Sequence, residues 1–504
     1  MDTLEEKLSS RSFRGVWLLL GGLLILKFIM ISQLGLKTEE AYYWNYAQHP
    51  DWSYFDHPPM VAWLIASSTT LGDNSPFWVH LPAVLTFALL TVLVYQLGKV
   101  MFEPRVGQLA ALLINFLPIF TVLSLVTIPD IPLLLAWTCG MTVGWKLVSE
   151  REPRWWVLVG VLTGLGCDSK YPAILIPLGI FLYLILAREW EQIFNRWAVS
   201  GALVAFVCFL PVIFWNSQHH WVSIMFQGTG RFQEAVSLKS RIGSWLIQMG
   251  ALSPFGFLAL LASVWHAFKE RHRAPVRYLL CWTVPFLSLM ILVSLRRGIH
   301  LNWPLPAYIG GILLMSVAGV SLLKRAPQKA FTWSALVLGG SFLTWSPLWF
   351  GCFYPVTQLN RGDDYHGWRA LASRITVWKN EMPRPERTFL VGHGYQAASM
   401  IAYYNHLPHL TLSNNILGED ALGYDYFEEP TEFLGWDAIL VVYQTPKTDS
   451  EYRSRVNLDE NRLRSVFAKI DGPEMLDVER GGSPLRRYLI YRCFEYRGPF
   501  RHSP

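Results

Sequence analysis

Two short polar segments and one turn of this chain carry acidic side chains together with an imidazole. Glu39 and Glu40 lie in KTEEAYYW, Asp56 and His57 lie in FDHPP, and Asp130 ends the turn VTIPD. A carboxylate can take the proton of an attacking hydroxyl group, and carboxylate oxygens are common ligands of divalent cations. Acids from separate loops therefore predict a general base together with a divalent-cation site, for which Mg²⁺, Mn²⁺ and Zn²⁺ are the candidate ions.

Each of these acids also has a purely structural interpretation. Glu39 and Glu40 can form a solvated helix start, because negative charge is favoured near the positive end of the helix dipole. Asp56 can form an Asx turn ahead of His57. Asp130 can cap the helix that follows it. The functional interpretation depends on the three segments meeting in the fold.

A second set of candidate residues is basic and suited to binding phosphate. Lys170 lies in CDSKYP, Arg231 follows the glycine-rich GTG, and Arg296 and Arg297 precede GIHLNWPLP. Ammonium and guanidinium groups form charge-assisted hydrogen bonds with phosphate oxygens. The alternative for Lys170 and Arg296 is that each extends along apolar surface to reach lipid head groups. Arg231, behind its glycine-rich turn, is less readily explained in that way.

The elements that must position these residues are membrane-spanning helices. Of the 504 residues, 52% are hydrophobic and 16% are charged, and apolar residues form runs such as 16–32 and 333–350. Such runs approach the roughly 20 residues that a spanning helix needs. The first run is too long for a cleavable signal and no small-residue cleavage site follows, so we expect it to remain as an anchor. We expect about eleven spans, near 15–35, 78–98, 106–126, 131–147, 155–168, 172–187, 197–215, 244–266, 278–295, 304–322 and 331–350.

The basic residues of the loops predict the orientation of these spans. Most Lys and Arg residues between the spans fall on the side of the amino terminus, and the opposite side holds Lys37, Lys170, Arg231, Lys239, Arg241, Arg296 and Arg297. The positive-inside rule then places the amino terminus in the cytoplasm. An odd number of spans places residues 351–504 outside. The net charge of +6 does not indicate a nucleic-acid partner, since the basic residues form no single stripe.

Two segments outside the bilayer are expected to fold. In the first outer loop, residues 36–77, a helix from Glu40 to about Gln48 and a second one from Pro59 would lie in the plane of the membrane interface. Residues 351–504 are charged and mixed in composition, and they contain AILVVYQ and RYLIYRCFEYR, which are typical of short strands. We therefore expect a transmembrane domain over 1–350 and a soluble α+β domain over 351–504.

Residues 35–310 contain a series of motifs that occur in the same order in a known class of enzymes. The motifs are EEAYYW, FDHPPMVAW, TIPDIPLLLAW, GLGCDSKYPAILIP, FWNSQHHWVSIMFQGTGR and HLNWPLPAY. With them the chain resembles the C-type glycosyltransferases of the protein O-mannosyltransferase superfamily, near the bacterial branch that includes the aminoarabinose transferase of lipid A. The resemblance implies the polytopic helical fold of that superfamily, the bacterial inner membrane as its location, and a periplasmic active site.

The resemblance also implies an activity. Such enzymes transfer a sugar from a polyprenyl-phosphate donor to a hydroxyl group and invert the anomeric carbon; the acceptor here would be lipid A, another glycolipid or a protein. By motif, the catalytic residues would be Glu39, Glu40 and Asp130, the tentative metal ligands would be Asp56 and Glu40, and His57 would lie at the donor phosphate. The outer basic residues Lys170, Arg231 and Arg297 would bind the same phosphate. The chain departs from the family at Glu39, where Asp is usual, and the longer side chain leaves the base assignment open.

Two other classes of protein remain open. A secondary transporter, of a small solute or a lipid-linked sugar, would carry ionisable residues near the membrane midplane and often show paired repeats. Here the charges lie at loop edges, apart from Lys27, and they do not recur in two matching halves of the sequence. A non-catalytic scaffold would present the carboxyl-terminal domain but would leave the acidic residues unexplained.

Overall fold

The chain folds as two compact units. The computed structural model describes residues 4–228, 236–353, 363–446, 452–454 and 457–499. The first unit, here called the helical unit, comprises Met1–Ser32, His57–Val61 and His80–Pro347. The second, here called the α/β unit, comprises Gln33–Asp56, Ala62–Val79 and Leu348–Pro504. Most of the first outer loop therefore groups with the carboxyl-terminal part of the chain.

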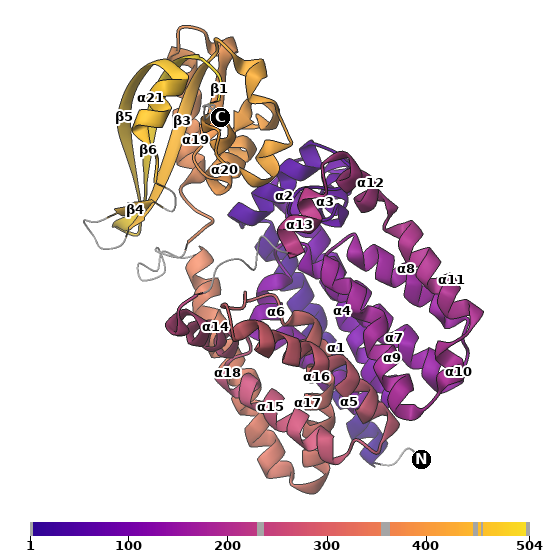
Figure 1. The fold of residues 1–504 in the computed structure, drawn as a ribbon. Coiled ribbons are helices and arrows are strands. Elements are labelled where there is room, and N and C mark those ends of the chain that lie inside the picture. The colour runs from indigo at the N-terminus through magenta and orange to yellow at the C-terminus, as the bar shows by residue number, and fades with distance from the viewer. Residues whose placement is uncertain (1–3, 229–235, 354–362, 447–451, 455–456, 500–504) are drawn as a thin grey trace. The chain divides into compact units, whose positions relative to one another are not determined.

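Apolar helices make up the helical unit (Figure 1). They are α1 (Leu4–Ile31), α4 (Pro76–Met101), α5 (Pro104–Phe116), α6 (Pro118–Leu123), α7 (Asp130–Glu150), α8 (Trp155–Cys167), η1 (Tyr171–Leu175), α9 (Ile176–Ala187), α10 (Trp190–Ile193), α11 (Arg196–Cys208), α12 (Leu210–Gln218), α13 (Val222–Gly228), α14 (Leu238–Ala251), α15 (Pro254–Lys269), α16 (Ala274–Ser294), α17 (Leu305–Arg325) and α18 (Pro327–Phe353). Several begin with a proline in the first turn, where the missing N–H would have no helical partner in any case. The buried faces of α4 to α9 and α14 to α18 form one hydrophobic core, in which α16 packs against α17 and α17 against α5.

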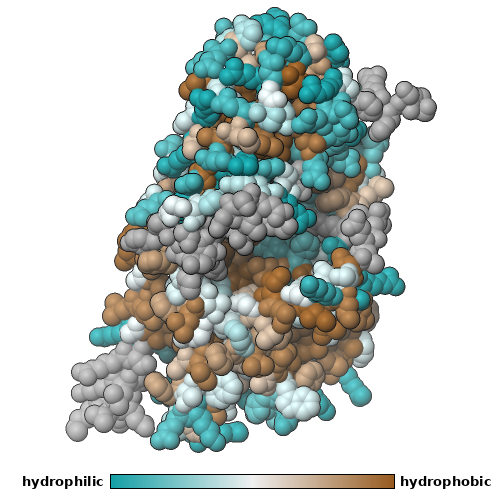
Figure 2. All heavy atoms as spheres, turned by 90° about the vertical axis from the view of Figure 1, so that its left-hand side faces the viewer, coloured by the Kyte–Doolittle hydropathy of each residue, from teal (hydrophilic) through white to brown (hydrophobic). Residues whose placement is uncertain are grey.

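The helical unit has the surface of a membrane protein. Within the residues that the structure describes, five helices are long and apolar enough to cross a bilayer, or up to seven if each of two bent pairs is one span. Large apolar side chains face outward, among them Leu18, Trp265 and Phe331, which are 77%, 70% and 75% exposed. Figure 2 shows hydrophobic side chains gathered over the helical part, while hydrophilic side chains predominate on the α/β unit. Water would not solvate such a surface, so the chain is a multi-pass membrane protein.

Some expected spans are broken helices. The span expected over 106–126 is divided at Leu117 into α5 and α6, because Pro118 cannot continue the backbone hydrogen bonding of the first helix. The span expected over 244–266 turns by 94° between α14 and α15. There Ser253 caps the new helix by accepting from Gly256 N–H, and Pro254 begins it. The other expected ranges fall on single helices or on short consecutive ones.

Helices α8 and α11 approach each other closely. A Cβ atom on Gly160 of α8 would lie 2.0 Å from the carbonyl oxygen of Gly201 in α11, so only glycine permits this contact. The chain leaves α8 through a tight turn in which Ser169 N–H and Lys170 N–H both donate to Gly166 O. This turn places Lys170 at the beginning of η1.

The α/β unit contains a mixed sheet and several helices. Its helices are α2 (Thr38–Gln48), α3 (Met60–Leu71, from Ala62 onward), α19 (Trp368–Glu381), α20 (Tyr395–Asn405) and α21 (Glu460–Val466). Short 3₁₀ turns are η4 (Pro385–Arg387), η5 (Pro408–Leu410), η6 (Asn414–Leu417), η7 (Leu422–Asp425) and η8 (Pro430–Phe433). The strands are β1 (Thr388–Gly392), β2 (Thr411–Leu412), β3 (Asp437–Pro446), β4 (Tyr452–Ser454), β5 (Phe467–Arg480) and β6 (Ser483–Tyr496).

The strands follow the order β2-β1-β3-β6-β5, and β4 pairs with β3. The pairs β1–β2 and β1–β3 are parallel, whereas β6 pairs antiparallel with β3 and β5. Residues 437–443 of β3 are all buried, which explains why AILVVYQ reads as a continuous apolar run. Helix α20 packs on β1, and α2 packs against α20. The expected carboxyl-terminal α+β fold, both expected strands and the two loop helices are confirmed.

Candidate active site

Asp130 is the centre of a buried polar cluster in the helical unit. It is the first residue of α7, and its side chain makes no cap for that helix. Lys170 Nζ donates to Asp130 Oδ1 at 2.8 Å, and Asn302 Nδ2 donates to Asp130 Oδ2 at 2.8 Å. Asp130 therefore orients side chains from two other turns, and the capping interpretation does not account for it.

The cluster is largely shielded from solvent. The side chains of Asp130 and Lys170 are 3% and 10% exposed. Burying either charge alone would be costly, and each is stabilised by the other at hydrogen-bond distance. Lys170 directs its ammonium group to a carboxylate inside the protein, so extension toward lipid head groups does not describe it.

A cavity of about 340 Å³ opens beside this cluster. Its polar lining includes Asp130, Lys170, Tyr171, Gln227 and Asn302. The apolar part of the lining comes mainly from α16, through Phe286, Leu289, Met290 and Val293, and Trp303 and Pro306 also line the cavity. A cavity lined by a charged pair and by many apolar side chains suits a ligand that joins a charged group to a hydrocarbon chain.

Two other predicted phosphate-binding residues lie in the same unit. The guanidinium carbon of Arg297 lies 5.2 Å from the ring centroid of Trp303, which lines the cavity. His57 is 8% exposed. Met60, three residues later, donates its N–H to the carbonyl oxygen of Asp168 at 2.9 Å, which ties the His57 segment to the turn that carries Lys170.

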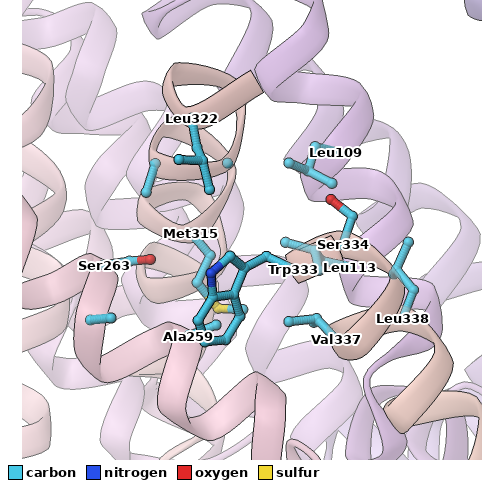
Figure 3. A pocket seen from close by; sticks show the side chains of 13 residues that line it. Leu109, Leu113, Ala259, Ser263, Met315, Leu322, Trp333, Ser334, Val337 and Leu338 are labelled. Atoms are coloured by element: carbon cyan, nitrogen blue, oxygen red, sulfur yellow. The ribbon is translucent and has the colours of Figure 1, made fainter. Parts of the chain in front are cut away.

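A second cavity, of about 260 Å³, is chemically different (Figure 3). It lies among α5, α15, α17 and α18, and its lining includes Leu113, Met315 and Val337. Its polar side chains are Ser263, Ser334 and Trp333. None of the residues lining it can act as an acid or base near neutral pH, so the cavity beside Asp130 is the candidate active site.

Asp56 and Glu40 lie in the α/β unit. Asp56 is 7% exposed, and its Oδ1 accepts hydrogen bonds from the hydroxyl groups of Tyr42, at 3.1 Å, and Tyr46. Burial, followed by the charge of Asp56, raises the pKa of Tyr42 and of Tyr46 well above the usual value, so both hydroxyls remain donors. Tyr54 stacks on Tyr46 with ring centroids 4.0 Å apart. Two tyrosines of α2 thus orient the Asp56 carboxylate.

The acidic pair at the start of α2 has a helix-start geometry. Glu40 is fully buried, and its Oε2 accepts from Lys37 N–H at 3.4 Å. Glu39 is partly exposed, and its Oε2 accepts from the Thr38 hydroxyl at 3.2 Å. Both acids lie in the first turn, where the helix dipole favours them. Complete burial of Glu40 exceeds what a solvated helix start would produce.

The predicted residues belong to two different units. Asp130 and Lys170 are in direct contact, and His57 and Arg297 belong to the same unit. Glu39, Glu40 and Asp56 belong to the α/β unit. Arg231 lies outside the described residues. The roles assigned to all of these residues from the motifs stay predictions.

Sequence reasoning missed Asn302 and the tyrosine pair. Asn302 lies in the motif HLNWPLPAY. The signal that could have identified it is a polar amide side chain between the apolar residues Leu301 and Trp303. Tyr42 and Tyr46 lie on the helix that the sequence placed in the plane of the membrane interface. Their spacing of four residues, which places both hydroxyls on one helix face, could have linked them to a shared partner.

Comparison with known proteins supports the resemblance. Residues 56–215 match the family described as dolichyl-phosphate-mannose-protein mannosyltransferase. The lipid A galacturonosyltransferase RgtD of Rhizobium johnstonii is 25% identical over 280 residues, which cover 55% of this chain and 59% of that protein. An undecaprenyl phosphate-alpha-4-amino-4-deoxy-L-arabinose arabinosyl transferase of Pseudomonas paraeruginosa is 26% identical over 297 residues, covering 56% of this chain and 53% of that one. The chain thus spans somewhat over half the length of these relatives.

The fold is similar over a greater length. The crystal structure of ArnT from Cupriavidus metallidurans in the apo state matches with a TM-score of 0.65 at 15% identity, covering 96% of this chain and 98% of that one. The same protein bound to undecaprenyl phosphate matches with a TM-score of 0.62 at 14% identity, covering 94% and 97%. At such low identity these matches establish the fold alone. Together with the sequence matches, they confirm that this chain resembles the C-type glycosyltransferases of the protein O-mannosyltransferase superfamily.

Proposed function

We propose that this protein is an inner-membrane glycosyltransferase that moves a sugar from a polyprenyl-phosphate donor to a hydroxyl group of an acceptor, with inversion at the anomeric carbon. The observation that supports this most is the cavity beside Asp130, which is lined by the Asp130–Lys170 pair and by apolar side chains of α16. A polyprenyl phosphate has the same division into a charged head and an apolar chain. The relatives named for lipid A and for undecaprenyl-phosphate-linked aminoarabinose make lipid A the first acceptor to test.

The proposed reaction is a single displacement. The acceptor oxygen forms a bond to the anomeric carbon while the bond from that carbon to the phosphate oxygen breaks. A carboxylate takes the acceptor proton, and polyprenyl phosphate leaves with the bonding electrons. Asp130, Glu39 and Glu40 are the candidates for this carboxylate.

Cationic residues would stabilise the leaving phosphate. Lys170 is held against Asp130, and Arg297 lies beside the cavity residue Trp303. Negative charge grows on the phosphate as the bond breaks, and positioned donors in a low-dielectric cavity stabilise that charge more than water would. An arriving donor phosphate would share Lys170 with Asp130, which links phosphate binding to the basicity of the acid. His57 and Arg231 are the further proposed phosphate partners.

The finer topology is part of the proposal. We place about eleven spans in residues 1–350, the amino terminus in the cytoplasm, and the active site with residues 351–504 in the periplasm. Excess Lys and Arg on the side of the amino terminus support this orientation.

A divalent cation at Asp56 and Glu40 also stays a proposal. Asp56 Oδ1 accepts hydrogen bonds from the hydroxyl groups of Tyr42 and Tyr46, and within the described residues the one group of three metal-ligating side chains includes neither Asp56 nor Glu40. No step of the proposed reaction passes through a cation.

Mass analysis of envelope lipids and glycans tests the activity in cells. We expect a sugar-modified acceptor in cells that carry the protein, and its loss both in cells without the protein and in cells that carry inserted Asp130→Asn. Unchanged lipids and glycans would reject the proposal. Solute uptake by vesicles containing the protein would support a transporter instead.

A further inference from the structure

Three metal-ligating side chains meet in the α/β unit, from segments far apart in the sequence. His49 ends α2, His409 lies in η5, and Glu428 lies between η7 and η8. Glu428 Oε1 lies 3.2 Å from His49 Nε2 and 2.7 Å from His409 Nδ1. The three ligand atoms all lie within 4.8 Å of one another, and this is the one such group of three within the described chain.

The structure fixes the His49 ring so that one nitrogen faces the cluster. His49 Nδ1 lies 2.8 Å from the carbonyl oxygen of Asn45. A carbonyl oxygen only accepts, so Nδ1 carries a hydrogen, and in a neutral ring Nε2 then presents a lone pair. The ring of Phe427 stacks on the imidazole ring of His49, with ring centroids 4.4 Å apart and an interplanar angle of 12°. Such orientation of an imidazole by a backbone carbonyl is usual behind metal-binding histidines.

The contact between His49 and Glu428 needs a positive species. With the hydrogen on Nδ1, the Nε2 lone pair faces a carboxylate oxygen, and two acceptors at 3.2 Å repel each other. Either a second proton on the imidazole or a metal ion between the two atoms removes the repulsion. The side chain of His409 faces the same oxygen, so a single ion could satisfy all three groups.

We propose that His49, His409 and Glu428 form a Zn²⁺ site that joins α2 to the carboxyl-terminal part of the α/β unit. Two imidazoles and a carboxylate, with water completing a tetrahedron, are a usual zinc ligand set. Ligand atoms of tetrahedral Zn²⁺ lie about 3.3 Å apart, given bonds of about 2.0–2.1 Å. His49 Nε2 and Glu428 Oε1 lie at nearly this separation, 3.2 Å. The His409 contact must open by about half an ångström to reach it, and at 62% exposure the side chain is free to do so.

The consequence of such a site is a cross-link. It would connect residue 49, just after the helix that carries Glu39 and Glu40, with residues 409 and 428. A metal that closes a chain segment of this length stabilises the folded state by reducing the freedom of the unfolded one, and by mass action on binding. This zinc site takes no part in the proposed sugar transfer, and its ligands differ from Asp56 and Glu40.

Zinc titration of the full-length protein in detergent tests the site. After chelator treatment, Zn²⁺ is added in competition with a chromophoric chelator, and Tm is measured with and without the ion. His409→Ala and Glu428→Gln remove ligands, and His272→Ala is the matched control because it removes an exposed imidazole between α15 and α16. We expect one saturable site whose affinity falls at least about 10-fold in the ligand variants, a loss that even outer-shell changes can cause. Only the wild type and His272→Ala should gain Tm from Zn²⁺.

A ligand exchange separates a metal site from a mere ion pair. His409→Cys replaces the imidazole by a thiolate, which also binds Zn²⁺ and Co²⁺. We expect this variant to bind Co²⁺ and to show a thiolate-to-cobalt absorption band that the wild type lacks. Absence of saturable Zn²⁺ binding by the wild type would overturn the proposal. Equal affinity of His409→Ala and His272→Ala would do the same.

Discussion

Replacing Asp130 with asparagine should destabilise the helical unit as well as slow the reaction. The charged atoms of Asp130 and Lys170 lie 2.8 Å apart, with 3% and 10% of the two side chains exposed. Removing one member of such a buried pair leaves the other charge without its partner, which costs about 3–5 kcal/mol. Asparagine keeps the shape of the side chain and can still accept a hydrogen bond from Asn302. The loss of stability in Asp130→Asn therefore measures the contribution of the Asp130 charge.

Thermal unfolding in detergent measures this loss. About 1 kcal/mol shifts the Tm of a 150–250-residue protein by about 2–4 °C, and that of a larger protein by less, so a drop of several degrees is expected. Glu152→Gln is the matched control, because it breaks an exposed pair with Arg154, whose side chain is 68% exposed, and should leave Tm unchanged. Asp130→Asn combined with Lys170→Met removes both charges and should recover most of the Tm without recovering turnover.

Two results would refute this reasoning. If Asp130→Asn melted at the temperature of Glu152→Gln, the pair would not be buried as the structure describes. If the double variant were less stable than Asp130→Asn alone, the unpaired Lys170 charge would not be the cause of the loss.

Four further predictions follow from other parts of the chain. Tyr46→Phe should cost about 1.5–3 kcal/mol of unfolding free energy in denaturant, because it removes a hydrogen bond to the Asp56 carboxylate; unchanged stability would contradict that bond. Arg231→Ala should weaken donor use by about 10-fold to 150-fold in a titration of polyprenyl-phosphate sugar, with Arg231→Lys recovering only part; unchanged donor kinetics would remove Arg231 from the site. Burial lowers the pKa of His393 to about 4, below the ordinary value of about 6.5, so the folded state loses stability as pH falls from 6.5 toward 4; His393→Gln should flatten this dependence, and an unaltered profile would contradict it. A reporter fused after residue 356 should be active only in the periplasm and one near Arg273 only in the cytoplasm, and the reverse pattern would overturn the orientation.

Much of the fold could be predicted because the pattern of apolar residues indicates most of the helices and strands. The runs that fill α4, α7 and α17 are long and unbroken, and residues 438–443 form a strand buried on both faces. The breaks were harder to predict. Pro118 and Pro254 end one helix and begin another, whereas Pro82 and Pro285 lie inside α4 and α16 without dividing them. A proline in a membrane sequence therefore does not decide between a kink and a new helix.

The candidate site was predicted as separate residues but not as pairs. Asp130 and Lys170 could be named from charge and position, while their contact depends on how α7 packs against α8. Asn302 has no charge to single it out in the sequence. His49 and Glu428 are 379 residues apart, and neither lies in a motif with metal-ligand spacing. Long-range contacts of this kind follow from tertiary packing, which local sequence patterns do not encode.

Sugar transfer by the purified protein is the most direct test of the central claim. The protein is reconstituted in liposomes with an undecaprenyl-phosphate-linked sugar and lipid A, and the product is followed by mass spectrometry, with its anomeric configuration determined by NMR. The account predicts a glycosylated acceptor of inverted configuration, released polyprenyl phosphate, and a rate at least about 100-fold lower with Asp130→Asn. Transfer that proceeds at the same rate with Asp130→Asn, or with retention of configuration, would contradict it.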